Sequence, residues 1–460
     1  MTYITLKVPK KAYQVSFEDM IYGLSEKKFN NMVIEETYDT RTKEYTTVPQ
    51  KLLELVDIEE MISDIEEFNN KNASYFNYPL IDNYSTFYLG KQRKGLNTFL
   101  KAIYKCKRPE NAERYDSSEL YKTVVEMFNA IKSNHPTNQH EQLQEETLKN
   151  LSNYLKRFFV IDEKMLEGFI KDSFRRIDAP NEDFKHALTS LKLLFEYKLY
   201  ATYHTTAFAY IKKRTTKMDI ERHQKNNSRW FLKLDFSNFF PSATPEFITN
   251  QLKMIFPYSE IYKTERGANA LNKALSLCFL GNGLPQGTPI SPLLTNIMMI
   301  PIDHQIAKMA RNQTPHLCYT RYADDLLLSS ELSFKWKDIQ QNIINILDEF
   351  NAPFTLKTTK TRYGSRSGRN WNLGMMLNKD NEITIGAEKK RFLKTTLHQF
   401  MTDYKDGNPW SISDTSVLDG QISYYKSIEK ENIEKIINKY SEKFGQDVNQ
   451  AIKNILRRVA

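Results

Sequence analysis

The sequence predicts an α+β protein in which helices cover one face of a mainly antiparallel sheet. Short strand-like runs alternate with helical stretches between residues 170 and 386, without regular β-α-β repetition, and helical patterns dominate on both sides of this part. The chain has 460 residues, of which 40% are hydrophobic and 26% charged, as in ordinary globular proteins. This composition excludes disordered proteins, collagen-like proteins and small proteins held together by disulfide bonds. The chain contains no repeat of 20–50 residues, which excludes a solenoid.

The first part of the chain, residues 1–165, is predicted to form a helical extension. It contains an acidic helical stretch at 57–68, a basic stretch at 91–108 and a polar linker candidate at 133–142. We expect it to be an accessory region, but the residues do not indicate its role.

The second part, residues 166–386, is predicted to hold the sheet. Its strand candidates are RWFLKLDF at 229–236, HLCYTRY at 316–322, DLLLSS at 325–330, PFTLKT at 353–358 and WNLGMML at 371–377. Helical stretches are expected near 244–255, 268–280, 290–310 and 335–350. The third part, residues 387–460, is helical again and predicts a terminal bundle.

Charge and cysteine usage narrow the choice of partner and compartment. Lys and Arg number 65 against 56 Asp and Glu, a surplus of +9 that fits either a polyanion such as nucleic acid or a well-solvated surface. Three widely spaced cysteines indicate reduced thiols, and no run approaches the roughly 18 apolar residues of a membrane span. We therefore expect a cytoplasmic protein that does not enter a membrane.

Acidic residues near the strand candidates suggest a metal site. Asp324 and Asp325 lie between two apolar runs at the tip of a predicted hairpin, and Asp235 lies inside another apolar run. Buried carboxylates require compensation, although a solvated turn also explains the Asp324-Asp325 pair. If the strands are neighbours, the three side chains converge in a pocket for Mg²⁺, and two such ions about 3.5–4 Å apart catalyse phosphoryl transfer.

A turn-rich segment, GNGLPQGTPISPLLTN at 281–296, separates these acidic elements. Glycine and proline allow its backbone to approach a bound base pair, and Gln286 and the amide of Gly287 are candidates to contact a nucleotide or template. Taken in isolation, the segment is also typical of a loop followed by a capped helix.

Four segments in order resemble the motifs of reverse transcriptases. They are LDFSNFFPS, LPQGTPISPLLTN, RYADDLLL and LKTTKTRYGSRSGRNWNLGMMLN, and the resemblance extends from about 171 to 440. It implies a right-hand polymerase fold with fingers and palm at 166–386 and a helical thumb at 387–460. It also implies an RNA-directed DNA polymerase that uses two Mg²⁺ ions, or Mn²⁺ in their place, with an RNA template, dNTPs and a DNA product.

The resemblance implies roles for the acidic residues. Asp235, Asp324 and Asp325 match the metal-binding acids, of which Asp235 and Asp324 bridge both ions, and Phe236 is counted with this metal site. Lys360 matches the lysine proposed to protonate leaving pyrophosphate, and the nearby Lys357 is the alternative for this role.

The resemblance also implies a nucleotide-binding set. Arg175, with Arg176 as the alternate, matches the arginine that holds the triphosphate, and Phe240 matches the bulky residue that clashes with a 2′-hydroxyl. Gln286 and Gly287 belong to the same set. For the arginines a plain surface pair, and for Phe240 a stacked core ring, are the alternatives.

Further motifs concern the primer and the duplex. Leu373 and Gly374 match the primer-grip turn, for which an ordinary edge hairpin is the alternative. The C-terminal helices resemble a thumb that tracks a duplex, and a homo-oligomer formed through the same helices is the alternative.

The residues of these motifs are similar to those of bacterial retron-like, abortive-infection and defence-associated reverse transcriptases. DIERH at 219–223 and NLG at 372–374 depart from two retron elements, and the long first region favours an antiphage defence enzyme templated by a noncoding RNA. Template-independent or protein-primed DNA synthesis is the alternative. A third hypothesis is an RNA-binding scaffold without catalytic activity.

Overall fold

The computed structural model describes residues 4–6, 34–36, 38–39, 44–45, 56–90, 99–114, 116–132, 149–161, 165–166, 169, 174–367, 371 and 374–457. The chain divides into two compact units. One comprises Met1–Tyr203 and Asn238–Pro301, and the other comprises His204–Ser237 and Ile302–Ala460. No helix among the described residues combines the length and apolar character needed to cross a bilayer.

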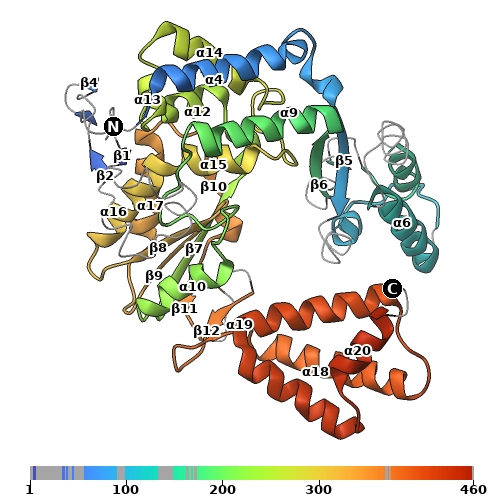
Figure 1. Cartoon of the computed structure of the whole chain (residues 1–460). Helices are drawn as coiled ribbons and strands as arrows, with labels where there is room; N and C mark the ends of the chain where they lie inside the picture. The colour runs from blue at the N-terminus through green and yellow to red at the C-terminus, as the bar shows by residue number, and fades with distance from the viewer. Residues whose placement is uncertain are drawn as a thin grey trace. The chain divides into compact units, whose positions relative to one another are not determined.

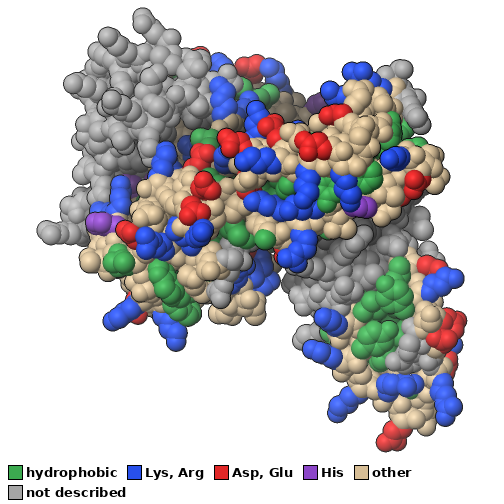
Figure 2. Space-filling view, turned by 90° about the horizontal axis from the view of Figure 1, so that it is seen from below, with side chains coloured by type: hydrophobic (Ala, Val, Ile, Leu, Met, Phe, Trp, Pro, Cys, Tyr) green, Lys and Arg blue, Asp and Glu red, His purple; other side chains and the backbone are tan. Residues whose placement is uncertain are grey.

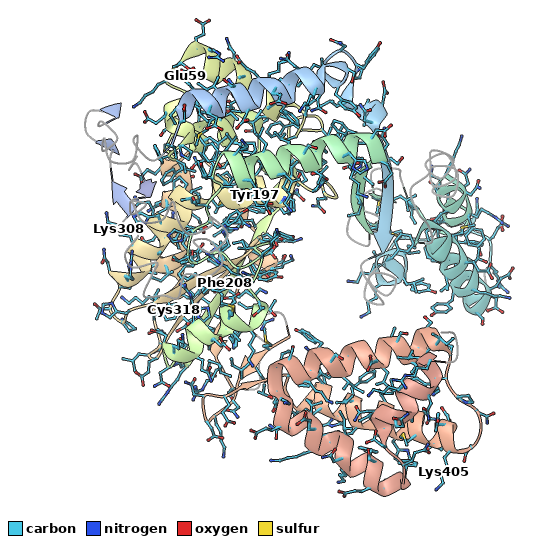
Figure 3. All side chains as sticks on the ribbon, in the orientation of Figure 1. Glu59, Tyr197, Phe208, Lys308, Cys318 and Lys405 are labelled. Atoms are coloured by element: carbon cyan, nitrogen blue, oxygen red, sulfur yellow. The ribbon has the colours of Figure 1, made fainter. Side chains whose placement is uncertain are left out.

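In the first unit, α4 (Ile58–Lys71) lies along α14 (Glu265–Ser276), as Figure 1 shows. The helix begins where the Asp57 side chain accepts a hydrogen bond from the Glu60 amide. Its apolar face is buried, whereas Glu59, labelled in Figure 3, binds Arg266 of α14. The helix predicted at 57–68 is therefore confirmed.

The region before residue 165 contains strands as well as helices. Its strand β5 (Tyr84–Gly90) pairs antiparallel with β6 (Phe174–Pro180), which lies beyond the predicted boundary. The expectation of a purely helical extension missed β5 because its pairing partner is remote in sequence. The three-part domain division itself stays a prediction. Other described elements of this region include β1 (Ile4–Leu6), β2 (Ile34–Glu36), β3 (Tyr38–Asp39), β4 (Glu44–Tyr45), η2 (Ala73–Phe76), η3 (Leu80–Asn83) and α6 (Ser117–Lys132).

The described elements in the rest of the first unit are helices, and the GLPQGTP turn precedes α15. Helices α12, α14 and α15 pack together, and the hydroxyl of Thr288 accepts a hydrogen bond from the Ser291 amide where α15 begins. The elements are α9 (Glu182–Leu193), the π-helical turn η4 (Leu194–Lys198), α11 (Phe239–Ser242), α12 (Pro245–Leu252), α13 (Tyr258–Ile261) and α15 (Ser291–Met298).

The second unit is built on an antiparallel sheet with the strand order β10-β7-β9-β8, in which β11 also pairs with β7 (Figure 1). The strands are β7 (Trp230–Ser237), β8 (Cys318–Tyr322), β9 (Asp325–Ser330), β10 (Thr355–Leu356) and β11 (Arg362–Ser365). The strands predicted at 229–236, 316–322 and 325–330 are confirmed. The run at 353–358 gives only two strand residues, because the chain leaves the sheet in the turn η5 (Thr358–Lys360).

One face of this sheet is joined to α16 (Ile300–Arg311) by a buried ion pair. Side chains alternate between faces, so Tyr319 and Arg321 of β8 point the same way. The Arg321 guanidinium donates to both carboxylate oxygens of Asp303 at 2.8–3.0 Å, and the Tyr319 hydroxyl donates to the same carboxylate. Arg321 and Asp303 are fully buried, so each charge depends on the other.

The other face is held by a histidine of α10 (Thr216–Lys225). His223 is fully buried and shares hydrogen bonds with the hydroxyls of Thr320 on β8 and Ser329 on β9. Burial, together with the charge of Arg222, lowers the pKa of His223 to about 3. His223 is therefore neutral, and its 3.9 Å approach to Asp219 is not an ion pair. The sheet thus has a helix on both faces, whereas the sequence predicted helices on one.

The C-terminal helices form the predicted bundle (Figure 1). Its members are α18 (Ala387–Lys405), α19 (Ile412–Phe444) and α20 (Val448–Leu456), which share an apolar core. Helix α19 is kinked at Glu429, whose carboxylate binds Lys390 and accepts hydrogen bonds from Thr384 and Ile385. Among the described residues of the run at 371–377, Met376 and Leu377 form β12 (Met376–Leu377), which pairs with β13 (Ile383–Thr384). The helix predicted near 335–350 is confirmed by α17 (Trp336–Glu349).

We predict that acid destabilises the sheet through His223. An unfolded histidine has a pKa near 6.5, so the stability due to neutral His223 is complete above pH ~6.5 and is lost as the pH falls toward 3. Urea unfolding at pH 7 and pH 5 measures this loss. His223→Gln should reduce the loss by about 2 kcal/mol, because glutamine does not titrate. An unchanged loss would contradict the assignment.

We also predict that Asp303→Asn destabilises the protein by about 3–5 kcal/mol, because it leaves the buried Arg321 charge without its partner. Urea unfolding at pH 7 measures the change. Glu66→Gln, which removes a partner from the exposed ion pair with Arg266, is the matched control and should have a much smaller effect. Similar effects of both substitutions would show that the buried pair is not important for stability.

Candidate active site

Two acidic residues face each other across the central strands of the sheet. In the antiparallel register of β7 and β9, Asp235 is directly opposite Asp325. Asp324 lies one residue earlier, in the two-residue turn between β8 and β9, and its carbonyl accepts a hydrogen bond from the Phe236 amide at 3.0 Å. The predicted convergence of the three acidic residues is thus present in the second unit.

The buried side chain of Arg321 holds the turn that carries Asp324. Ala323 has a φ of +56°, a left-handed conformation that is unfavourable for alanine. The Arg321 guanidinium donates to the Ala323 carbonyl at 3.1 Å, and the Arg321 carbonyl accepts from the amide of Phe208, labelled in Figure 3. The ion pair described above therefore supports the backbone that carries the acidic side chains.

Two lysines bind two of the three carboxylates. Lys360 of η5 donates to both oxygens of Asp235 at 2.6 and 2.8 Å, and Lys233 of β7 donates to Asp325 at 2.7 Å. Asp324 forms no ion pair with any described residue. The cluster therefore holds three acidic and two basic side chains.

Burial makes this cluster unfavourable for negative charge. The pKa of Asp324 is raised by burial and then by the neighbouring charges of Asp235 and Asp325. The pKa of Asp325 is also raised by burial, although Lys233 opposes the shift. A cation placed among the carboxylates would relieve both effects.

The donor set fits a divalent cation. Carboxylate oxygens are the ligands that Mg²⁺ prefers, and the partly buried Asp324 carboxylate forms no ion pair with any described residue. In the part of the chain that is described, no group of three or more His, Cys, Asp or Glu side chains is already arranged as a metal site. Both oxygens of the Asp235 carboxylate accept hydrogen bonds from Lys360. Phe236 offers no ligand through its side chain, which packs against Phe354.

The first unit brings together several of the residues predicted to bind nucleotide. The Gln286 carbonyl accepts a hydrogen bond from the Asp178 amide of β6 at 2.9 Å. Gly287 has a φ of +125°, and a Cβ there would lie 2.9 Å from the Asp178 carbonyl oxygen, so the turn requires glycine. The carbonyl of Phe240, a half-buried residue, accepts from the Leu284 amide at 3.0 Å.

Some predicted residues are described only in part. Arg175 and Arg176 lie on β6, the strand that contacts the Gln286 turn, but their side chains are outside the described residues. Leu373 of the predicted primer grip is also outside them. Gly374 is described, has a φ of +96°, and accepts a hydrogen bond from Lys389 of α18 through its carbonyl.

Sequence reasoning missed Lys233, Asp303 and His223. Lys233 was open to prediction, because a residue two positions before Asp235 in a strand shares its face. Asp303 carried no comparable signal, although the strand that it contacts follows α16 directly. His223 ends the DIERH segment that was compared with a retron element, but its contacts with Thr320 and Ser329 are remote in sequence.

Comparison with known proteins identifies a family for more than half of the chain. Residues 161–393 match the family described as reverse transcriptase (RNA-dependent DNA polymerase). The retron Ec83 reverse transcriptase of Escherichia coli is 28% identical over 251 residues, covering 52% of this chain and 74% of the relative. The retron Ec73 reverse transcriptase of the same organism is 27% identical over 244 residues, with the same coverage of each chain.

Solved structures show a weaker likeness. Apo telomerase from Candida tropicalis matches 88% of this chain and 93% of its own at 9% identity, with a TM-score of 0.39. Telomerase from Candida albicans matches 79% and 82% at 12% identity, with a TM-score of 0.34. The family match covers just over half of the chain and includes the strands that carry Asp235 and Asp325. The chain belongs to the reverse transcriptase family, the RNA-directed DNA polymerases, and resembles the bacterial retron enzymes within it.

Proposed function

We propose that this reverse transcriptase extends a primer 3′-hydroxyl with dNTPs by two-metal chemistry at the cluster of Asp235, Asp324 and Asp325. The observation that carries the proposal is the β7–β9 register, which sets Asp235 opposite Asp325 and beside the Asp324 turn. Two bound Mg²⁺ ions, or Mn²⁺ in their place, supply activation of the attacking hydroxyl and stabilisation of the leaving oxygen. Asp235 and Asp324 would hold them.

Lys360 is proposed to act on the leaving group. It is half exposed, with 51% of its side chain accessible, and its ammonium group donates to both oxygens of the Asp235 carboxylate. Once free of Asp235, the ammonium group would be available to the pyrophosphate as a proton donor. A lysine is suited to this work because its flexible stem carries a compact charge.

The first unit supports nucleotide selection. Phe240 is proposed to exclude a 2′-hydroxyl, and its backbone is held by Leu284 while its ring packs edge-on against Phe239. Gln286 and Gly287 are proposed to contact the nucleotide or template beside β6, the strand of Arg175 and Arg176. The primer-grip role of Leu373 and Gly374 rests on the sequence motif.

The template is proposed to be a noncoding RNA, and the biological role to be antiphage defence in the cytoplasm. Both proposals rest on the sequence resemblance. The surface charge does not decide the matter, since Lys and Arg side chains occur over several parts of the face shown in Figure 2, mixed with Asp and Glu. The exposed Arg391, Phe392 and Lys394 of α18 offer cations and an aromatic ring to a duplex.

We predict that the purified full chain, with the RNA that co-purifies, incorporates labelled dNTPs in Mg²⁺ and not in EDTA. Asp235→Asn and Asp324→Asn should each lower the rate by roughly 100-fold or more, because each removes a metal ligand. Asp348→Asn, an exposed carboxylate on α17, is the matched control and should leave the rate unchanged.

Sequencing the product separates the competing functions. A product complementary to the co-purified RNA supports templated synthesis. Untemplated sequence, or a product linked to a protein hydroxyl, would favour the alternative modes of DNA synthesis. Equal rates for Asp324→Asn and the wild type would overturn the site assignment, and no incorporation under any condition would favour an RNA-binding scaffold.

A further inference from the structure

A lysine not assigned by the motif is built into the carboxylate cluster. Lys233 and Asp235 are two residues apart on β7, so both side chains emerge from the same face. Asp325 is opposite Asp235 on β9, which places Lys233 diagonally across from Asp325. Its ammonium group donates to the Asp325 carboxylate at 2.7 Å, and both side chains are about four-fifths buried, at 21% and 22% exposure.

The two lysines of the cluster differ in how firmly they are held. Lys360 is 51% exposed on the turn η5, so it regains solvent when it leaves Asp235. Lys233 emerges from the middle of a strand that is paired on both sides. If it left Asp325, a mostly buried ammonium and a mostly buried carboxylate would both lose their partner, which is costly. A metal therefore displaces Lys360 more easily than Lys233.

We propose that Lys233 is a positioning residue that stays paired with Asp325 when metal binds and keeps that carboxylate out of the ligand set. This inference rests on the proposed function, in which Asp235 and Asp324 hold the metal. Mg²⁺ is commonly bound by one or two carboxylates together with substrate phosphates. By neutralising Asp325, Lys233 keeps the metal affinity of the nucleotide-free site low, so that tight binding requires the phosphates of the incoming dNTP.

Mn²⁺ binding to the full chain without nucleotide tests this role, with free Mn²⁺ measured by electron paramagnetic resonance. Lys233→Met should bind Mn²⁺ about tenfold more tightly, because it releases Asp325 as a third anionic ligand. The double variant Lys233→Met/Asp325→Asn keeps the net charge of the wild-type pair and should return to within about twofold of the wild-type affinity. Asp324→Asn should weaken binding strongly.

Two further variants serve as controls for the charge of Lys233. Lys233→Arg keeps the positive charge and should preserve wild-type affinity, and circular dichroism checks that each variant is folded. Lys337→Met removes an exposed cation from α17 of the same unit and should have no effect.

The opposite pattern would overturn the inference. Asp325→Asn would then weaken Mn²⁺ binding as much as Asp324→Asn, or Lys233→Met would leave affinity unchanged while Lys360→Met increased it. If dNTP also failed to promote Mn²⁺ binding in the wild type, the two-metal function itself would be wrong, which distinguishes the two failures.

Discussion

The register between β7 and β9 is the constraint on which the rest of the site depends. Side chains of a strand alternate between faces, so a shift of one residue would move Asp235 to the face that now holds Leu234. The observed register aligns Asp235 with Asp325 and places buried leucines on the opposite face. Burial of those leucines and convergence of the carboxylates are therefore satisfied by the same pairing.

Polar groups on both faces of the sheet add specificity to this register. Arg321 with Asp303 on one face, and His223 with Thr320 and Ser329 on the other, connect particular strand positions to particular helices. Any other pairing would leave these buried groups without partners, at a cost of about 1–3 kcal/mol or more for each group. The arrangement also supports the strained Ala323 turn, where a small displacement would move Asp324.

Much of the fold was predictable from local pattern, and the failures have physical causes. The strands β7 and β9 and the helix α4 were predicted because their apolar periodicity is strong. Only two residues of the run at 353–358 pair with β7, because the chain then turns at η5 and brings Lys360 to Asp235. Strand β5 was missed because its pairing partner β6 is remote in sequence.

The candidate site was also predicted in part. The convergence of Asp235, Asp324 and Asp325 was predicted from the motifs, and the second unit contains it. The ion pairs of Lys233 with Asp325 and of Arg321 with Asp303 were not, because they depend on which strand or helix becomes the neighbour. The sequence motifs identified the groups that carry chemistry, including Lys360, but they did not identify Lys233 as a counter-ion of the cluster.

The central claim is that Asp235 and Asp324 form the metal-binding pair of this polymerase, with Lys360 exchanging for metal and Asp325 held by Lys233. Anomalous diffraction from crystals of the full chain grown with Mn²⁺ and a dNTP tests it most directly. The account predicts manganese peaks at the Asp235 and Asp324 carboxylates, with Lys360 displaced and the Lys233–Asp325 pair intact. Manganese absent from these carboxylates, or bound through Asp325 with Lys233 displaced, would contradict it.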